Sequence, residues 1–421
     1  MQDNNSLRFA GDIKLEKIQI SSLSGQYANI INQVIGIEIY EDLFAPFITL
    51  SIVLRESVDY LNLFPFVGEE YIELVLSTPL VDKKIDGKFY IYKISDRENT
   101  KDREVVYTIN AISGEYLTDA NRKLSKTYSG NVGEIAYDIL TKELNTDKPI
   151  LVEKTNNTVA FTANYWSPVK CLNYASSTAA NVGESPSYLF YEDRTGFNFR
   201  SIDELCKAQS YHQLTKDNYS RSSENNTTST RKDPQEDYKR IMEMSVPVVT
   251  DYMQEIQTGR LKSRLITHDI VTKQYAVKDY SVKKDTKNPA TLLNTYPGYS
   301  KYATSNSIST LLVMPKYFGN YNDFADVTNT KTIQKRISFF KNLEKYKVTV
   351  NILGRTDYTV GQVFELNIPR VTQISKEEDA KDPILSGRYI VSAISHKITR
   401  EMHTCNVELI KNSVLVNLSK D

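Results

Sequence analysis

The sequence is poor in the residue types that usually build redox, metal or disulfide chemistry. Its 421 residues include three cysteines, four histidines and one tryptophan. The cysteines, Cys171, Cys206 and Cys405, are odd in number and lack CxxC spacing, which favours reduced thiols over a disulfide framework. Neither charge is in excess, since Lys plus Arg and Asp plus Glu both total 52. That balance argues against a dedicated nucleic-acid-binding protein, which would usually carry a basic excess.

Long apolar runs are also absent. The N-terminal stretch MQDNNSLRFAGDIKLEK has no apolar core of signal-peptide length, and no run approaches the roughly 18 apolar residues of a membrane-spanning helix. We therefore expect a soluble protein that is made and assembled in the cytoplasm, with no stable membrane association. Tyrosine, by contrast, is abundant, with 28 residues, and it suits half-buried sheet surfaces and subunit interfaces.

Recognisable catalytic and cofactor motifs are missing. GNVGE (130–134) precedes a helical pattern but lacks the Lys-Ser/Thr of a phosphate-binding loop, and neither GxSxG nor HExxH occurs. His212 and His268 are isolated in the sequence. His396 and His403 fall on neighbouring predicted strands near Cys405, but a zinc site needs three or four converging ligands and the facing of His396 is open. We expect ordinary strand residues here, no metal, no cofactor and no enzymatic activity.

The acidic residues Glu69, Glu70 and Glu73 have the spacing of a solvated or lumen-facing strand face. A glycosidase-type pair of carboxylates stays open as an alternative, because the sequence does not give the distance between two carboxylates.

Hydrophobic periodicity divides the chain into β-rich and mixed segments. Residues 129–144 and 167–179 have helical spacing, the second with Ser167 as N-cap and Pro168 at the first helical position. Residues 187–202 have the pattern of a hairpin. The predicted fold class is α+β, mainly β, with two antiparallel β-barrel domains and smaller inserted α+β domains. The predicted segments are a first β-domain at 1–115, a small α+β domain at 116–210, a polar linker at 211–244, the first part of a second β-domain at 245–285, an insertion with a helix at 286–345, and the second part of that β-domain at 346–421.

One strand phrase occurs twice. DGKFYIYKIS (86–95) and SGRYIVSAISHKI (386–398) each run from a glycine through a basic and an aromatic residue to Ile-Ser. The preceding and following strands also correspond: VGEEYIELVL (67–76) with VGQVFELNIP (360–369), and YTINAI (107–112) with TCNVEL (404–409), aligned on Asn110 and Asn406. The repeated glycines are Gly68 and Gly361 before one strand, and Gly87 and Gly387 at the next. We interpret this as two copies of one β-domain; chance similarity of short strands is the alternative.

With this order of elements, the chain resembles the baseplate hub proteins of contractile-tailed phages, of the T-even type. It is more distantly similar to the hub part of type VI secretion spike proteins. The resemblance rests on the repeated strand phrases, on ISGEYL…GNVGEIAYDIL opening the small domain, and on the hairpin YLFYEDRTGFNFRSI. It implies that the two β-domains are tube-type barrels and that the protein is a structural component of a virion tail baseplate. The hub of another contractile injection system, or a tail-associated cell-wall hydrolase, is the alternative.

The symmetry of a tail offers a reason for two copies of one domain in each chain. Three chains with two similar barrels each would present six similar faces to a six-fold tail tube and three-fold features to a central spike. The resemblance therefore implies a homotrimer that encloses a channel for the tape measure protein and for DNA in transit. Its other implied partners are a separate spike protein, with or without a lysozyme domain, a tail tube or tube-initiator protein, and baseplate wedge components.

Overall fold

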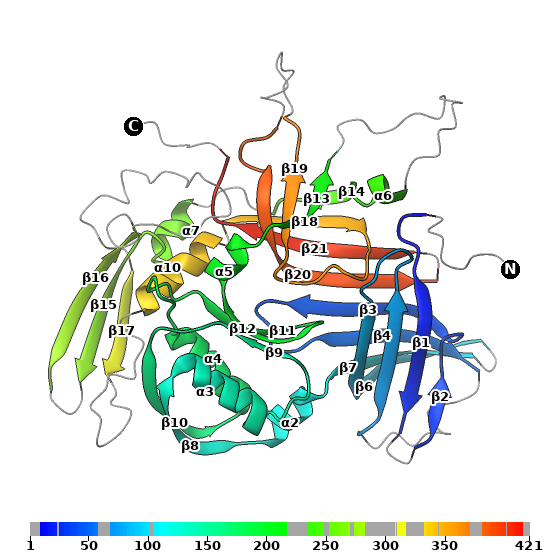
Figure 1. Cartoon of the computed structure of the whole chain (residues 1–421), viewed down its shortest axis with the longest axis horizontal. Helices are drawn as coiled ribbons and strands as arrows, with labels where there is room; N and C mark the ends of the chain where they lie inside the picture. Colours follow the sequence, from blue (N-terminus) through cyan, green and yellow to red (C-terminus); the bar gives the residue numbers. More distant parts are fainter. Residues whose placement is uncertain are drawn as a thin grey trace.

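The computed structural model describes residues 9–22, 25–57, 68–101, 104–216, 234–247, 252–269, 273–282, 308, 310–316, 332–343, 345–370, 381–400 and 402–415. The chain is mostly β, with one large, mainly antiparallel sheet, as the sequence predicts (Figure 1). Among the described residues, no helix combines the length and apolarity needed to cross a bilayer.

The N-terminal part of the large sheet surrounds its own apolar core. Its strands are β1 (Lys14–Ser21), β2 (Tyr27–Asn29), β3 (Val34–Asp42), β4 (Thr49–Glu56), β5 (Tyr71–Ser77), β6 (Ile85–Lys101) and β7 (Glu104–Ser113). They alternate buried and exposed residues, and Ile52, Leu74 and Ile109 are fully buried in one cluster. Alternation with period two places every second side chain in that core.

The C-terminal part of the same sheet has a second core. Its strands are β13 (Ser210–Thr215), β14 (Ile241–Ser245), β18 (Tyr346–Leu353), β19 (Val363–Asn367), β20 (Gly387–Thr399) and β21 (His403–Lys411). Val350, Phe364 and Val407 are fully buried in this core. Figure 1 shows β18, β19, β20 and β21 of this part in orange and red and β13 and β14 in green, next to the blue N-terminal part.

The two parts repeat one arrangement of five strands. The order β3-β4-β7-β6-β5, which we call copy 1, corresponds to β14-β18-β21-β20-β19, which we call copy 2. The register agrees as well, because Gly87 lies opposite Leu74 in copy 1 and Gly387 lies opposite Leu366 in copy 2. The two repeated phrases therefore occupy equivalent strands, β6 and β20.

The irregularities of the strands also repeat. A β-bulge at Tyr92 interrupts the pairing of β6 with β7, five residues after Gly87. A β-bulge at Ser392 interrupts the pairing of β20 with β21, five residues after Gly387. A second pair of bulges falls at Ile35 and Met242, in β3 and β14. Since a bulge fixes where a strand bends and twists, shared bulges indicate a common origin more strongly than shared strand residues do.

Two details of the predicted repeat are wrong. The alignment of Asn110 with Asn406 is out by two residues, because Ser95 faces Thr108 and the equivalent Ser395 faces Asn406. A shift of two leaves the alternation of faces unchanged, so the sequence pattern did not reveal it.

The second error is the assignment of 245–285 to the second β-domain. Within it, β15 (Lys262–Asp269) and β16 (Tyr275–Ser281) pair with β17 (Leu311–Lys316) in a separate three-stranded sheet, at the left of Figure 1. The first strand of copy 2 is instead β14, which comes mainly from the segment 211–244 that was predicted to be a linker. Most of β13 comes from the same segment. Alternation identifies a strand but not its partner.

The separate sheet is held by a helix that the sequence predicts. Helix α10 (Ile333–Leu343) lies beside it, where Gln334 Nε2 donates a hydrogen bond of 3.0 Å to the Ser263 carbonyl and Ser338 Oγ one of 2.7 Å to the Arg260 carbonyl. A short helix, α7 (Tyr252–Gln257), precedes β15, and another, α6 (Pro234–Asp237), precedes β14.

The small domain matches its predicted elements. It consists of α2 (Glu115–Asn121), β8 (Leu124–Asn131), α3 (Val132–Asp138), the π-helix η1 (Ile139–Glu143), β9 (Ile150–Val152), β10 (Thr158–Trp166), α4 (Pro168–Thr178), β11 (Tyr188–Asp193), β12 (Gly196–Ser201) and α5 (Ile202–Lys207). Ser167 caps α4 as expected, its side chain accepting a hydrogen bond of 3.3 Å from the Lys170 N–H. Phe197 and Leu172 are fully buried in the core of this domain.

Candidate interface: the joint between the copies and its free counterparts

A strand pairing joins the two copies into one sheet. The C-terminal half of β20 pairs antiparallel with β3, from Ala393 opposite Asp42 to Thr399 opposite Gly36. At the middle of this joint, Lys397 Nζ lies 3.8 Å from Glu38 Oε1, and Ser395 Oγ donates a hydrogen bond of 2.6 Å to the same carboxylate oxygen. Copy 1 and copy 2 therefore meet along an ordinary β-ladder, in addition to side-chain packing.

A buried ion pair lies next to the joint. Arg194, from the turn between β11 and β12, places its Nε 2.9 Å from Oε1 of Glu41, whose side chain is fully buried. Thr359 Oγ1 donates a hydrogen bond to Glu41. Burial raises the pKa of Glu41, and the positive charge of Arg194 opposes that rise. The small domain thus supplies the countercharge for a carboxylate of copy 1.

Within the described part of the chain, the strand edges equivalent to the joint have no strand paired to them, although Arg240, just before β14, forms a bridge with Thr215. In the described strand pairings, β14, the counterpart of β3, has β18 as its partner on one side, and the C-terminal half of β6, the counterpart of β20, has β7 on one side. Burial follows the pairing: Ser392 and Ile394 are fully buried at the joint. The equivalent Tyr92 is 53 % exposed and Ile94 is half-buried. Exposed strand edges of this kind accept another strand.

A polar face crosses the whole joined sheet on the side opposite the cores. One row runs straight across six strands through Lys93, Asn110, Ser51, Glu38, Lys397 and Thr404. The neighbouring rows carry Tyr40, Asn406 and Glu243. The face is rich in hydroxyl and amide groups, and both charges occur on it. We call this surface the polar face.

Three of the four repeat glycines have a backbone that favours glycine. The φ angles are +104° at Gly68, +79° at Gly361 and +120° at Gly387. Gly87 lies outside the left-handed region, but a Cβ there would meet the Phe89 ring at 2.7 Å. The first pair, Gly68 and Gly361, thus corresponds in conformation, whereas in the second pair only Gly387 has the unusual φ.

The structure separates the four histidines into three environments. His212 Nε2 lies 3.0 Å from the Tyr238 carbonyl, and His268 lies on β15 in the separate sheet. His396 and His403 meet in the interior of copy 2, where Cys405 joins them. The sequence left the facing of His396 open, and the pairing of β20 with β21 decided it. Cys171 is a buried thiol in the core of the small domain, and Cys206 is a buried thiol elsewhere in the core cluster that contains Cys405.

The acidic residues near β5 do not form the solvated face that the sequence predicts. Glu70 is 1 % exposed and accepts a hydrogen bond of 3.0 Å from the Gly68 N–H, whereas Glu69 is exposed. Glu73 forms an ion pair with Lys17. Glu70 faces the interior because it continues the alternation of β5, in which Ile72 and Leu74 are also buried, whereas Glu69 and Glu73 fall on the other face.

Comparison with known proteins places the fold among phage tail proteins. No protein-family model matches the sequence, and no curated protein does. The tail protein from Neisseria meningitidis MC58 aligns with a TM-score of 0.53 and 10% sequence identity, over 94% of this chain and 96% of that one. The 43 kDa tail protein of prophage MuSo2 from Shewanella oneidensis aligns with a TM-score of 0.55 and 8% identity, over 94% of this chain and 98% of that one. The resemblance to phage tail proteins is therefore confirmed at the level of the fold.

Proposed function

We propose that this protein is a structural, non-catalytic hub of a contractile phage tail, in which three chains form a ring. The observation that supports it most directly is the joint between copy 1 and copy 2. The same contact is available at β14, at one end of the sheet, and along the C-terminal half of β6, beyond its pairing with β5, because these are the counterparts of β3 and β20. If β14 of one chain pairs with β6 of the next, every copy contacts its neighbours in the same way.

A head-to-tail contact of this kind closes into a ring when its rotation allows. Three chains give 2 × 3 = 6 copies, which matches a six-fold tail tube, whereas each chain contributes one small domain and one separate sheet. A three-fold spike would dock against those unduplicated parts. In this ring the polar face lines the channel through which tape measure protein and DNA pass.

The register of the joint specifies a test. In β6, Glu98 holds the position that Lys397 holds in β20, once the extra bulge of β6 after Ser95 is counted. In β14, Ser245 holds the position that Glu38 holds in β3. Glu98 of one chain should therefore lie opposite Ser245 of the next chain, as Lys397 lies opposite Glu38 at the joint. Antiparallel partners lie within disulfide reach. The E98C/S245C variant should therefore form covalent trimers under oxidising conditions, together with dimers, on a non-reducing gel.

The matched control uses the joint within the chain. The K397C/E38C variant should form an intramolecular disulfide and remain a single chain on the same gel. Native mass spectrometry of the unmodified protein at micromolar concentration, with and without a spike protein, provides the independent measurement. A strictly monomeric or dimeric species in both samples would rule out the proposed ring.

A further inference from the structure

Three potential metal ligands converge inside copy 2, beside the joint. His396 Nδ1 lies 3.0 Å from His403 Nε2 and 3.2 Å from Cys405 Sγ, and Cys405 Sγ lies 3.6 Å from His403 Nε2. In the described part of the chain, this is a compact group of side chains able to hold a metal ion, and all three are buried.

We propose that His396, His403 and Cys405 bind one thiophilic metal ion, zinc in the first instance, as a structural site. With Zn–N of about 2.0 Å and Zn–S of about 2.3 Å, two ligands of a tetrahedral ion are about 3.3 Å apart for two nitrogens and about 3.5 Å for nitrogen and sulfur. The observed triangle of 3.0, 3.2 and 3.6 Å is close to that geometry.

Hydrogen bonding alone accounts poorly for the triangle. His396 Nε2 lies 3.2 Å from the Tyr358 carbonyl, which can only accept, so His396 carries its proton there and its Nδ1 is a bare acceptor. Only one neighbour can use that lone pair fully, yet both His403 Nε2 and Cys405 Sγ approach it. A backbone carbonyl that fixes the tautomer of a histidine is a typical second-shell partner of a metal ligand.

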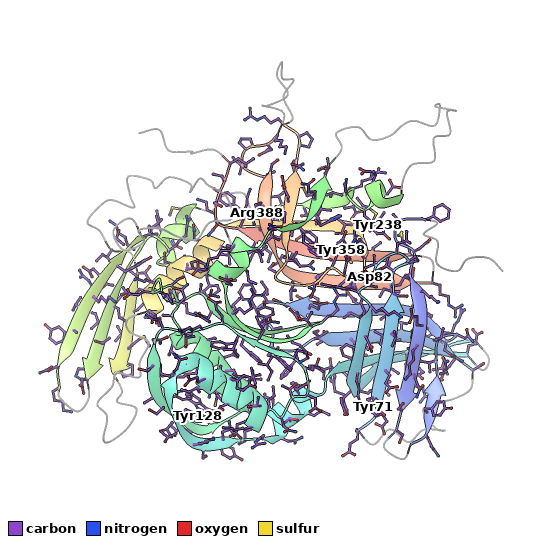
Figure 2. The ribbon with its side chains drawn as sticks, viewed as in Figure 1. Tyr71, Asp82, Tyr128, Tyr238, Tyr358 and Arg388 are labelled. Atoms are coloured by element: carbon purple, nitrogen blue, oxygen red, sulfur yellow. The ribbon has the colours of Figure 1, made fainter. Side chains whose placement is uncertain are left out.

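The surroundings suit a buried site. The side chains of His396 and His403 are both fully buried. Arg194 is the nearby positive charge, and Glu41 neutralises it through their ion pair. Tyr358, labelled in Figure 2, supplies the second-shell carbonyl.

Two further observations indicate a built site. A Cβ on Gly354 would lie 2.3 Å from the ring of His403, so the glycine provides the space that this ring occupies. In copy 1, Tyr107 and Val105 stand where copy 2 has Cys405 and His403. The repeated fold is therefore complete without these ligands, and copy 2 carries them for a separate reason.

Metal analysis of the full-length protein tests the proposal. Protein produced with zinc in the medium should contain about one zinc ion per chain, and refolding with Co²⁺ in its place should give the thiolate-to-cobalt charge-transfer band of a tetrahedral site. Cys405→Ser should lose the band and the zinc. Cys171→Ser and His212→Asn, which change a buried thiol and a half-buried imidazole elsewhere, should keep both.

The cobalt spectrum of the unmodified chain decides the question even if Cys405→Ser does not fold. Folded wild-type protein without stoichiometric zinc and without a thiolate–cobalt band would overturn the proposal. The same holds if the Cys405→Ser variant folds and retains its metal.

Discussion

Lys411 shows how one residue can adapt to a core. Its side chain is fully buried, and its Nζ donates hydrogen bonds to the carbonyls of Ile384 and Ser386, the latter at 2.8 Å. The ring of Tyr389 lies 4.5 Å away on the other side. Carbonyl oxygens and an aromatic face stabilise a cation only in part, so burial lowers the pKa of Lys411 to about 7.

That pKa predicts the pH dependence of stability. Above pH 7 this lysine is protonated in the unfolded chain but neutral in the folded chain, so unfolding takes up a proton. The free energy of unfolding therefore rises with pH, up to the ordinary lysine pKa near 10.4. Between pH 8 and 9 the wild type should gain about 1 kcal/mol relative to Lys411→Met. Urea denaturation of both proteins at each pH measures the difference. Parallel pH profiles would show that the lysine stays charged.

The repeat glycines allow a second prediction at the scale of the residue. Gly68 has a φ of +104°, and a Cβ there would meet nothing within 4 Å, so backbone strain is the main expected effect of a side chain. Gly68→Ala should lower the free energy of unfolding by about 1 kcal/mol. Gly183→Ala is the control, because its φ is ordinary and its Cβ would lie 3.4 Å from Asn181 Oδ1. Equal stability of the two variants would argue against the strain.

At the scale of the element, the joint between β3 and β20 depends on more than its ladder. The carboxylate of Glu41 is buried where the two copies and the small domain meet, and Arg194 is its countercharge. An ion pair of this kind contributes little net stability, but removal of one partner leaves a buried charge without compensation.

Arg194→Met should therefore destabilise the protein by about 3–5 kcal/mol. The loss of stability should grow as the pH rises. Burial raises the pKa of Glu41, and without Arg194 the folded state favours the protonated carboxyl group even more, whereas the same group ionises readily in the unfolded chain. The E41Q/R194M double variant should lose less than Arg194→Met alone. Chemical denaturation at pH 5 and pH 8 tests this, and a double variant no more stable than the single one would contradict it.

At the scale of the whole molecule, the polar face is the feature that the proposed ring would use. Its central row carries Lys93 and Lys397 against the one acid Glu38, and a neighbouring row adds Glu243, so the two charges balance. A wall of this kind offers DNA few phosphate contacts, and affinity for DNA depends mainly on such contacts.

Arginine at Ser51, Asn110 and Thr404 should change that property. The triple variant should bind linear double-stranded DNA with an affinity that falls as salt rises, but should bind covalently closed circles poorly, because a closed ring cannot be threaded onto a circle. The control carries arginine at Ser125, Thr127 and Thr162, which are exposed on the small domain, and should bind linear and circular DNA alike. Fluorescence anisotropy and gel shift measure both. Equal binding of circles by both variants would contradict the assignment of the polar face to the channel.

The sequence by itself determined the class of the fold, the small domain and the duplication. Period-two alternation and the phrases around Gly87 and Gly387 are local properties, and local patterns fix which segments are strands and which helices, such as α4 and α10, interrupt them.

Only the tertiary structure decided which strands pair with one another. Nothing in the alternation of β15 and β16 says that they pair with β17, and a shift of two residues in the alignment of Asn110 leaves the pattern of faces intact. The convergence of His396, His403 and Cys405, and the open edges of β6 and β14, likewise depend on register and strand order. Those are set by contacts between residues far apart in the chain, which a local pattern does not contain.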